Sequence, residues 1–400
     1  MAVAENTTYR GSQILIGLMN DDGTLPATPK ALDISKFCTS GIVMNDNRES
    51  KEYMPVVNAG RQASTIYGAK KPGGTLELEL GTQLLPLLIS GVIGDFTTAA
   101  KVVSAWTATT VTAVGDIVQH SGGKYLVAQK VLGTATTGAT EPDLTGITED
   151  RTVLTTIDGA DASNGVYWMV RDNLYDYSAT DTFCIKRFFI IERNAEGCGS
   201  ANVFDRISTN VRLGTFNIEK SDGTVSYSQS ITLVAEQIQK SSEADFTDIT
   251  VDPGNITTPN ESFFKEEDVT IRIDGAKYGT MHRFMMNHSR EFSQTLSTEP
   301  NENIIKFGGV VATGETTIDL DPTEYDLLEN VDFKSVVVTM DKGDGEIATI
   351  TYPAVQFANP TEERNGNEPI LMMANLKPTG DASNAMISIA GTTSLNWIPA

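Results

Sequence analysis

Short stretches of alternating apolar and polar residues recur along this 400-residue chain, whereas long helical periodicities are scarce. The clearest example lies in residues 72–94, where a Gly-Gly pair leads into the sequence TLELEL at positions 75–80. A period of two predicts a strand with one buried and one solvated face. The apolar residues 83–90 that follow, with Thr82 as the N-cap, predict a short helix.

A second copy of this pattern occurs in residues 308–329. It has a Gly-Gly start, alternation through residues 316–320 and a helix start at Asp321, with Pro322 at position N1 and Glu324 at position N3. Around both copies the same order repeats: strand, long loop, Gly-Gly strand, short helix and three further strands. We therefore predict a mainly β fold with tandem β-sandwich domains and short helices.

The repeat and the composition together suggest domain boundaries. The first β-sandwich domain is predicted to be discontinuous, formed by residues 1–96 and 173–245, and the second to span residues 263–400. Residues 246–262 are polar and contain prolines, which predicts a linker. Residues 97–172 are rich in Thr, Ala and Gly and are predicted to form a small inserted all-β module.

The inserted module carries a spaced pattern, W…GDxV…GxxY…G…P…DG…W, within residues 106–168. This pattern is similar to that of small β modules related to chitin- and cellulose-binding domains. Exposed aromatic rings offer a flat apolar face on which a sugar ring can stack, so Trp106, Tyr125 and Trp168 are the candidate glycan-binding residues. The favoured alternative is that Trp106 and Trp168 form the core of this small module.

The chain is strongly acidic, with 30 Lys and Arg against 52 Asp and Glu and a formal net charge of −22. This charge argues against a protein that grips nucleic acid by neutralising phosphates, and suits a surface that repels polyanions. Two long polar stretches, residues 45–71 and 288–306, nevertheless carry clustered cations. We hypothesise that these contact an acidic neighbouring subunit, with solvated hairpin charges as the alternative: Arg48, Lys51, Arg61, Lys70, Lys71, Arg290 and Lys306.

Residues with catalytic or metal-binding chemistry do not form a recognisable motif. The cysteines (38, 184 and 198) and histidines (120, 282 and 288) lack metal-site spacing, so free thiols and no metal or cofactor are expected. The sequence DKGDGE at residues 341–346 is better explained by a hairpin turn than by a calcium loop. No apolar run has the length of a membrane span or the flanks of a signal peptide, so neither is expected.

The order of the elements extends over nearly the whole chain outside the module. It comprises the turn DGTLPATP at residues 22–29, the polar stretch 45–71 leading into GGTLELEL, and the strands CIKRFF at 184–189 and TVSYSQSITLVA at 224–235. RFMMNHSR, FGGVVATGETTIDL, SVVVTM, TYPAVQF and ILMMANL repeat the order in the second half. This organisation resembles the phage major tail tube protein of long, non-contractile tails, through order and spacing rather than through a single motif.

The resemblance implies a structural virion protein, not an enzyme, that assembles in the bacterial host cytoplasm into the phage tail. Rings of six β-sandwich domains would stack as a tube, so two domains per chain imply three chains per ring with pseudo-sixfold symmetry, and one domain implies six chains. The implied partners are other copies of the chain, the tape-measure protein, phage DNA in the lumen, and the tail terminator and distal tail proteins. The module would lie outside the tube, where it could meet host-surface glycans.

In this interpretation the alternating strands line the tube. If Leu76, Leu78 and Leu80 face the sandwich core, the alternating positions Glu77 and Glu79 point into the lumen. The corresponding residues in the second copy are Glu315, Thr317 and Asp319. A wet, mostly negative lining would let DNA slide without capturing its phosphates.

Three other functions remain open at this point. The main alternative is a phage surface adhesin or receptor-binding protein that acts through the module. A second alternative is a capsid or baseplate component of the same virion, which would differ from a tail tube protein only in that its assembly does not grow as a tube. A glycan-degrading enzyme ranks last, because no pair of carboxylates can be singled out as acid and base.

Overall fold

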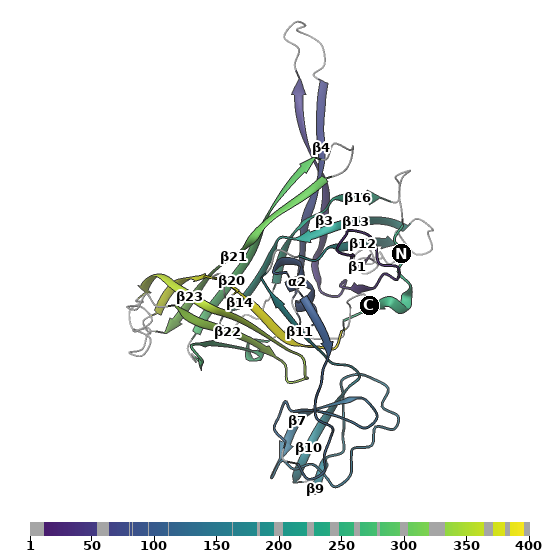
Figure 1. Ribbon diagram of the computed structural model, residues 1–400, viewed down its shortest axis with the longest axis vertical. Coiled ribbons are helices and arrows are strands. Elements are labelled where there is room, and N and C mark those ends of the chain that lie inside the picture. Colours follow the sequence, from purple (N-terminus) through teal and green to yellow (C-terminus); the bar gives the residue numbers. More distant parts are fainter. Residues whose placement is uncertain are drawn as a thin grey trace, which may run out of the picture.

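The computed structural model in Figure 1 confirms a mainly β chain. The residues that it describes are 12–53, 64–79, 81, 83–94, 96–110, 112–161, 163–181, 185–195, 203–221, 228–240, 248–259, 265–277, 281–296, 303–319, 333–363, 371–380 and 385–395. Within them the strands form three sheets and include a curled half-barrel, with a single α-helix between two of the sheets.

The first sheet is nine-stranded, in the order β17-β2-β1-β12-β13-β15-β4-β3, with β16 also paired to β13. Its strands are β1 (Ser12–Leu18), β2 (Ala31–Asp33), β3 (Cys38–Tyr53), β4 (Ser64–Glu79), β12 (Phe188–Ala195), β13 (Val203–Leu213), β15 (Ser228–Val234), β16 (Gln237–Lys240) and β17 (Ile256–Thr257). Strand β17 lies within the stretch predicted as a linker and pairs in parallel with β2. That part of the stretch therefore belongs to the sheet.

The second sheet is 11-stranded and combines strands from both halves of the chain. Its strands are β5 (Phe96–Ala100), β11 (Tyr175–Thr180), β14 (Thr215–Ser221), β18 (Val269–Ile273), β19 (Ala276–Lys277), β20 (Met281–Leu296), β21 (Asn303–Asp319), β22 (Lys334–Asp341), β23 (Ile347–Glu363), β24 (Leu371–Pro378) and β25 (Ser388–Thr393). Strand β14 pairs with β20, and β11 pairs with β25. One hydrophobic core contains Leu76 and Ile318, so the two halves pack as one unit.

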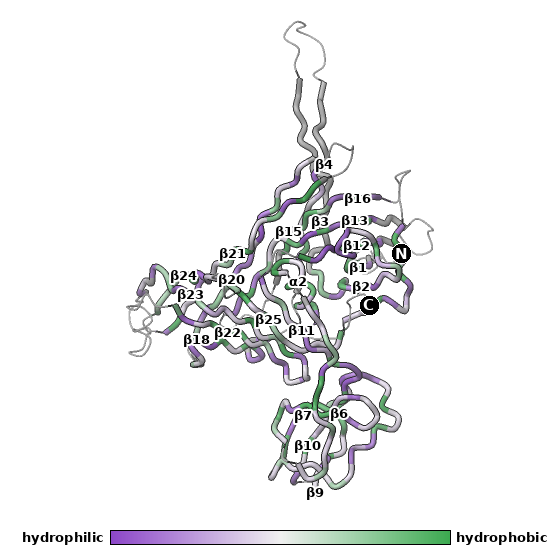
Figure 2. The backbone as a smooth tube through the Cα atoms, in the orientation of Figure 1, coloured by the Kyte–Doolittle hydropathy of each residue, from purple (hydrophilic) through white to green (hydrophobic). Residues whose placement is uncertain are grey.

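Helix α2 (Leu85–Val92) lies within this core, and every one of its residues is buried. It contacts β13 of the first sheet and β14 and β20 of the second, and Figure 2 colours it as mainly hydrophobic. The prediction of Thr82 as the N-cap is wrong, because the helix begins after Leu84 without a side-chain cap. Burial on all sides stabilises the helix instead. The second predicted helix, from Asp321, lies outside the described residues.

Of the two alternatives for residues 45–71, a binding loop or a long hairpin, the described residues form the hairpin, and the stretch 288–306 predicted as a loop also lies largely in paired strands. Strands β3 and β4, of 16 residues each, pair from Cys38 opposite Leu78 to Tyr53 opposite Ser64. Their paired ends project well beyond the sheets (Figure 1). Strands β20 and β21 similarly pair across the stretch that was predicted as the second long loop.

The inserted residues form a separate small sheet with its own core. Its strands are β6 (Ile117–Gln119), β7 (Tyr125–Leu132), β8 (Thr152–Val153), β9 (Asp158–Asp161) and β10 (Asn164–Arg171). Leu126, Trp168 and Val170 are buried together in this core. The module lies at the opposite end of the molecule from the β3–β4 hairpin (Figure 1). Among the described residues, no helix is long and apolar enough to cross a membrane.

Candidate functional site

Six strands from both halves of the chain lie side by side in a surface that we call the wall: β4, β15, β14, β20, β21 and β24. Antiparallel ladders join β4 to β15, β14 to β20, β20 to β21 and β21 to β24, and the β20–β21 ladder has two register shifts. Gly214 connects β13 of the first sheet to β14 of the second, and its N–H donates to the Thr232 carbonyl of β15 (2.7 Å). The Thr232 N–H in turn donates to Oγ1 of Thr215 (2.9 Å). The wall therefore runs across the junction of the two sheets.

One face of the wall is apolar and buried. Leu76 and Leu78 of β4 are both 0% exposed, which confirms their predicted core-facing positions. Phe216 of β14, Phe284 of β20 and Ile318 of β21 are buried in the same cluster. Leu80 lies outside the described residues. Burial of this face fixes the strand register, because a slip by one residue would expose every apolar side chain.

The other face of the wall is mainly polar and solvent-accessible, with Val311 (53%) and Met373 (40%) as exposed apolar side chains on it. Glu77 of β4 lies on this face, and so do Glu315, Thr317 and Asp319 of β21. The structure therefore brings these four predicted lining residues onto one continuous face, although they come from different halves of the chain. The backbone of Glu79 belongs to β4, but its side chain is outside the described set.

Charges on this polar face are partly neutralised. The Arg283 guanidinium lies 3.3 Å from the Glu219 carboxylate and 3.4 Å from that of Glu315. Nε2 of His282 lies 2.6 Å from the Asp319 carboxylate. Lys71 and Lys377 are exposed on the face as well. The face is thus solvent-accessible and mixed in charge, and its Arg283 lies between two carboxylates.

The cations predicted to contact a neighbouring subunit differ in exposure. Arg290 was expected on an exposed loop, and this prediction is wrong: the residue is only 4% exposed. Its guanidinium donates to the carbonyl oxygens of Val92 (2.8 Å) and Ile93 (2.8 Å), at the C-terminus of α2. Lys306 is exposed. The side chains of Arg48, Lys51 and Lys70 are not among those described, and Arg61 lies outside the described residues.

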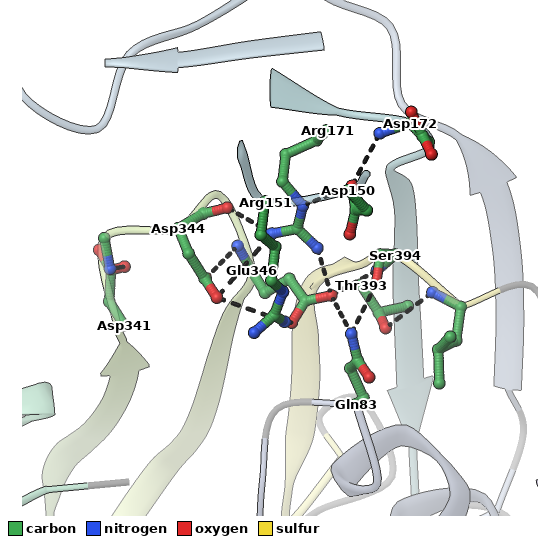
Figure 3. Close-up of polar contacts among 12 residues, drawn as sticks. Gln83, Asp150, Arg151, Arg171, Asp172, Asp341, Asp344, Glu346, Thr393 and Ser394 are labelled. Carbon is green, nitrogen blue, oxygen red and sulfur yellow. Dashed lines mark hydrogen bonds and ion pairs between the residues drawn. The ribbon is translucent and has the colours of Figure 1, made fainter. Parts of the chain in front are cut away.

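A buried ionic cluster joins the module to the main body, as Figure 3 shows. Glu346, just before β23, lies 2.9 Å from Nη2 of Arg171 and 2.6 Å from Nη2 of Arg151, both of the module. It also accepts hydrogen bonds from Nε2 of Gln83 (3.0 Å) and the Ser394 N–H (2.8 Å). Burial alone would raise the pKa of Glu346, but the two arginines outweigh it and lower this pKa to about 2.

Sequence reasoning missed this cluster. The turn at residues 341–346 was correctly predicted, since it connects β22 to β23. Its role in holding the module was not, because Glu346 lies 175 residues from Arg171 along the chain. The available signal was the position of Arg171 next to the end of the insertion, where the module meets the body.

The aromatic residues of the module are not a sugar-stacking platform. Trp168 is 0% exposed and Tyr125 is 7% exposed, so the glycan-stacking prediction is wrong for both. Trp106 packs partly buried against the same core. The indole N–H groups of Trp106 and Trp168 donate to one carboxylate oxygen of Asp158, at 2.9 and 2.7 Å. The core alternative is therefore confirmed for Trp168.

Comparison with known proteins identifies no relative, since neither a protein-family model nor a curated protein matches the chain. No group of three or more His, Cys, Asp or Glu side chains that could hold a metal ion occurs in the described part of the chain. The wall, the projecting hairpin and the module are therefore the structural features that bear on function.

Proposed function

We propose that this protein is a structural virion protein that assembles into stacked rings forming the tube of a phage tail. One observation carries the proposal: the wall is continuous across both halves of the chain, buried on one face and polar on the other. A closed ring of such walls would enclose a lumen lined by their polar faces. Glu77, Glu315, Thr317 and Asp319 would then line the path of the DNA.

The charges of the polar face suit a conduit through which DNA passes without being bound. Phosphate groups bind proteins chiefly through unneutralised Lys and Arg. Arg283 already lies between Glu219 and Glu315, so it offers little attraction to a passing phosphate. The net charge of −22 adds a general repulsion of polyanions.

The other features agree with this assembly. In this proposal the projecting β3–β4 hairpin, with two strands of 16 residues each and Lys71 exposed on β4, would contact a copy in the next ring. The module would lie outside the lumen, because a lumen filled by it could not pass DNA. Both halves contribute strands to the wall, which favours three chains per ring with pseudo-sixfold symmetry. In this proposal the chain is not an enzyme and needs no cofactor.

The partners follow from the same proposal. Copies of the chain would form the rings, and the tape-measure protein and DNA would occupy the lumen without specific binding. The tail terminator and distal tail proteins would close the two ends. Assembly would take place in the host cytoplasm, and the mature location would be the virion tail.

Negative-stain electron microscopy of the purified chain, with its mass in solution, tests the proposal. We expect hollow tubes with a regular axial repeat and external knobs, and threefold averaged end views. Because polymerisation can require an initiator, the chain is also incubated with purified tail-tip complexes. A chain that stays monomeric under both conditions would contradict the proposal and favour the alternative, a phage surface adhesin that acts through the module.

A further inference from the structure

Arg212 of β13 is a buried cation that forms no ion pair with a carboxylate of the described residues. The residue is 5% exposed, and its Nη1 donates to the Ile185 carbonyl (2.9 Å). Its guanidinium carbon lies 5.9 Å from the centroid of the Phe307 ring, a cation–π contact that compensates the charge only in part. Nε is buried and meets no acceptor in the part of the chain that the structure describes. A buried charge normally has both an opposite charge and a full set of hydrogen bonds, and Arg212 lacks both within this set.

A second arginine lies close by. Arg187, immediately before β12, is half-buried, and like Arg212 it forms no ion pair within the described residues. Burial and, after it, the charge of Arg187 lower the pKa of Arg212 to about 10. The two guanidiniums therefore repel each other without a direct counter-charge. Three carboxylates act on the two arginines only at longer range: Asp21, Asp22 and Glu236.

The junction with the module shows how this chain otherwise compensates a buried arginine. Arg171 is 0% exposed, and its Nη2 lies 2.9 Å from the Glu346 carboxylate. Burial would lower the pKa of Arg171, but nearby carboxylates, Glu346 foremost, outweigh it and raise this pKa. An anion in contact with Arg187 and Arg212 would supply to them what Glu346 supplies to Arg171.

The backbone around Arg187 is shaped to hold its guanidinium in place. Gly23 has a φ of 86°, and a Cβ at this position would lie only 2.5 Å from Nη1 of Arg187. Asn210 has a φ of 51°, at the point where the pairing of β12 and β13 shifts register. Its Oδ1 lies 3.4 Å from Nη1 of Arg187, and its Nδ2 donates to the Gly23 carbonyl (3.5 Å). A non-glycine residue in this conformation is strained and persists only where its surroundings fix it.

We infer that Arg187 and Arg212 together bind one small oxyanion of the phosphate or sulfate class. A tetrahedral oxyanion has enough acceptor positions for N–H groups of both guanidiniums, and its charge would remove their repulsion. The small exposed fraction of Arg212 favours a free ion over a phosphate group of a macromolecule. Both arginines lie outside the wall, so the inference goes beyond the tube proposal and leaves the polar face as described.

Isothermal titration calorimetry of the full-length protein at pH 7 tests the inference. Sodium phosphate and sodium sulfate are titrated at constant ionic strength, which separates specific binding from screening, and nitrate is the planar monovalent control. We expect saturable binding of one phosphate or sulfate per chain, at least tenfold tighter than that of nitrate.

Variants locate the binding to the two arginines. Arg187→Gln should weaken phosphate binding at least tenfold at an unchanged melting temperature in chloride buffer. Arg212→Gln should do the same, and where it does not fold, the half-buried Arg187→Gln decides the question. Arg272→Gln, at an exposed arginine, removes the same charge elsewhere and should bind as the wild type.

Three results would overturn the inference: neither ion binds saturably, nitrate binds equally well, or Arg187→Gln binds as the wild type. An equal loss of binding in Arg272→Gln would also overturn it, because it would show a general effect of charge. The tube proposal is tested separately by microscopy. Tubes without anion binding would refute only the anion site, and anion binding without tubes would refute only the conduit.

Discussion

At the scale of single residues, buried His288 makes the stability of the core depend on pH. Its ring is fully buried, with Nδ1 3.0 Å from the Phe216 carbonyl oxygen and Nε2 2.8 Å from the Tyr352 hydroxyl. Burial lowers the pKa of His288 to about 4 from its ordinary 6.5. The ring is therefore neutral in the folded protein, so Nδ1–H donates to Phe216 and Nε2 accepts from Tyr352.

We predict that the free energy of unfolding decreases as pH falls from 6.5 to about 4, because the unfolded chain binds a proton that buried His288 excludes. A shift of this size corresponds to about 3 kcal/mol. Urea unfolding at several pH values measures it. His288→Gln should lose this part of the pH slope, whereas the control His120→Gln should keep it. Equal slopes in wild type and His288→Gln would contradict the prediction.

Glu346 holds the module through a charge that is buried in the folded state. We predict that Glu346→Gln lowers the free energy of unfolding at pH 7 by about 3–5 kcal/mol, because Arg171 loses a fully buried partner. Glu267→Gln, at an exposed pair with Lys265, is the matched control and should change it by at most about 1 kcal/mol. Calorimetry of both variants measures the difference, and similar losses in the two would contradict the assignment.

The lowered pKa of Glu346 also gives this contact a pH dependence. Its stabilising contribution is fully present above the ordinary value of 4.5 and is lost as pH falls toward about 2. Asp344 acts in the opposite direction, because burial and the nearby Glu346 raise its pKa. The Glu346→Gln variant should therefore lose less stability than the wild type on acidification from pH 4.5.

At the scale of elements, the sequence predicted the strands whose burial follows a local alternation of polar and apolar residues. Alternation at residues 75–80 revealed a strand because Leu76 and Leu78 are buried on one face only. For residues 45–71 the sequence left a binding loop and a long hairpin open, because a projecting hairpin buries too little to impose an apolar period. Arg290 was misjudged for a different reason, because a polar sequence gave no sign that α2 would end against this side chain.

Arg290 therefore acts as the C-terminal partner of α2. We predict that Arg290→Lys lowers the free energy of unfolding by about 1–3 kcal/mol, because an ammonium cannot span the Val92 and Ile93 carbonyls as the guanidinium fork does. Hydrogen exchange should speed up in α2 before it does in β12. Arg272→Lys, at an exposed bond to the Gly275 carbonyl, is the control. Unchanged α2 protection in Arg290→Lys would show that packing alone holds the helix.

At the scale of the whole molecule, contacts between distant segments decide the architecture. The junction at Gly214 joins two sheets into one wall, and Glu346 joins the module to the body. Glu346 and Arg171 are 175 residues apart, so no local pattern could reveal their contact. The alternation of polar and apolar residues did indicate which faces are wet, and that is why Glu77 and Glu315 were found without knowledge of the junction.

The projecting hairpin gives the final prediction at this scale. It extends beyond the body of the chain (Figure 1), and in a stacked assembly it would contact a neighbouring copy. Deletion of residues 57–67, closed by a short Gly-containing turn, removes the start of β4 but should leave its pairing with β15 intact, because that pairing involves only residues 73–79. We expect soluble monomers or single rings with wild-type circular dichroism that do not stack, as seen by microscopy and light scattering. Tubes of normal length from this variant would show that the hairpin does not connect the rings.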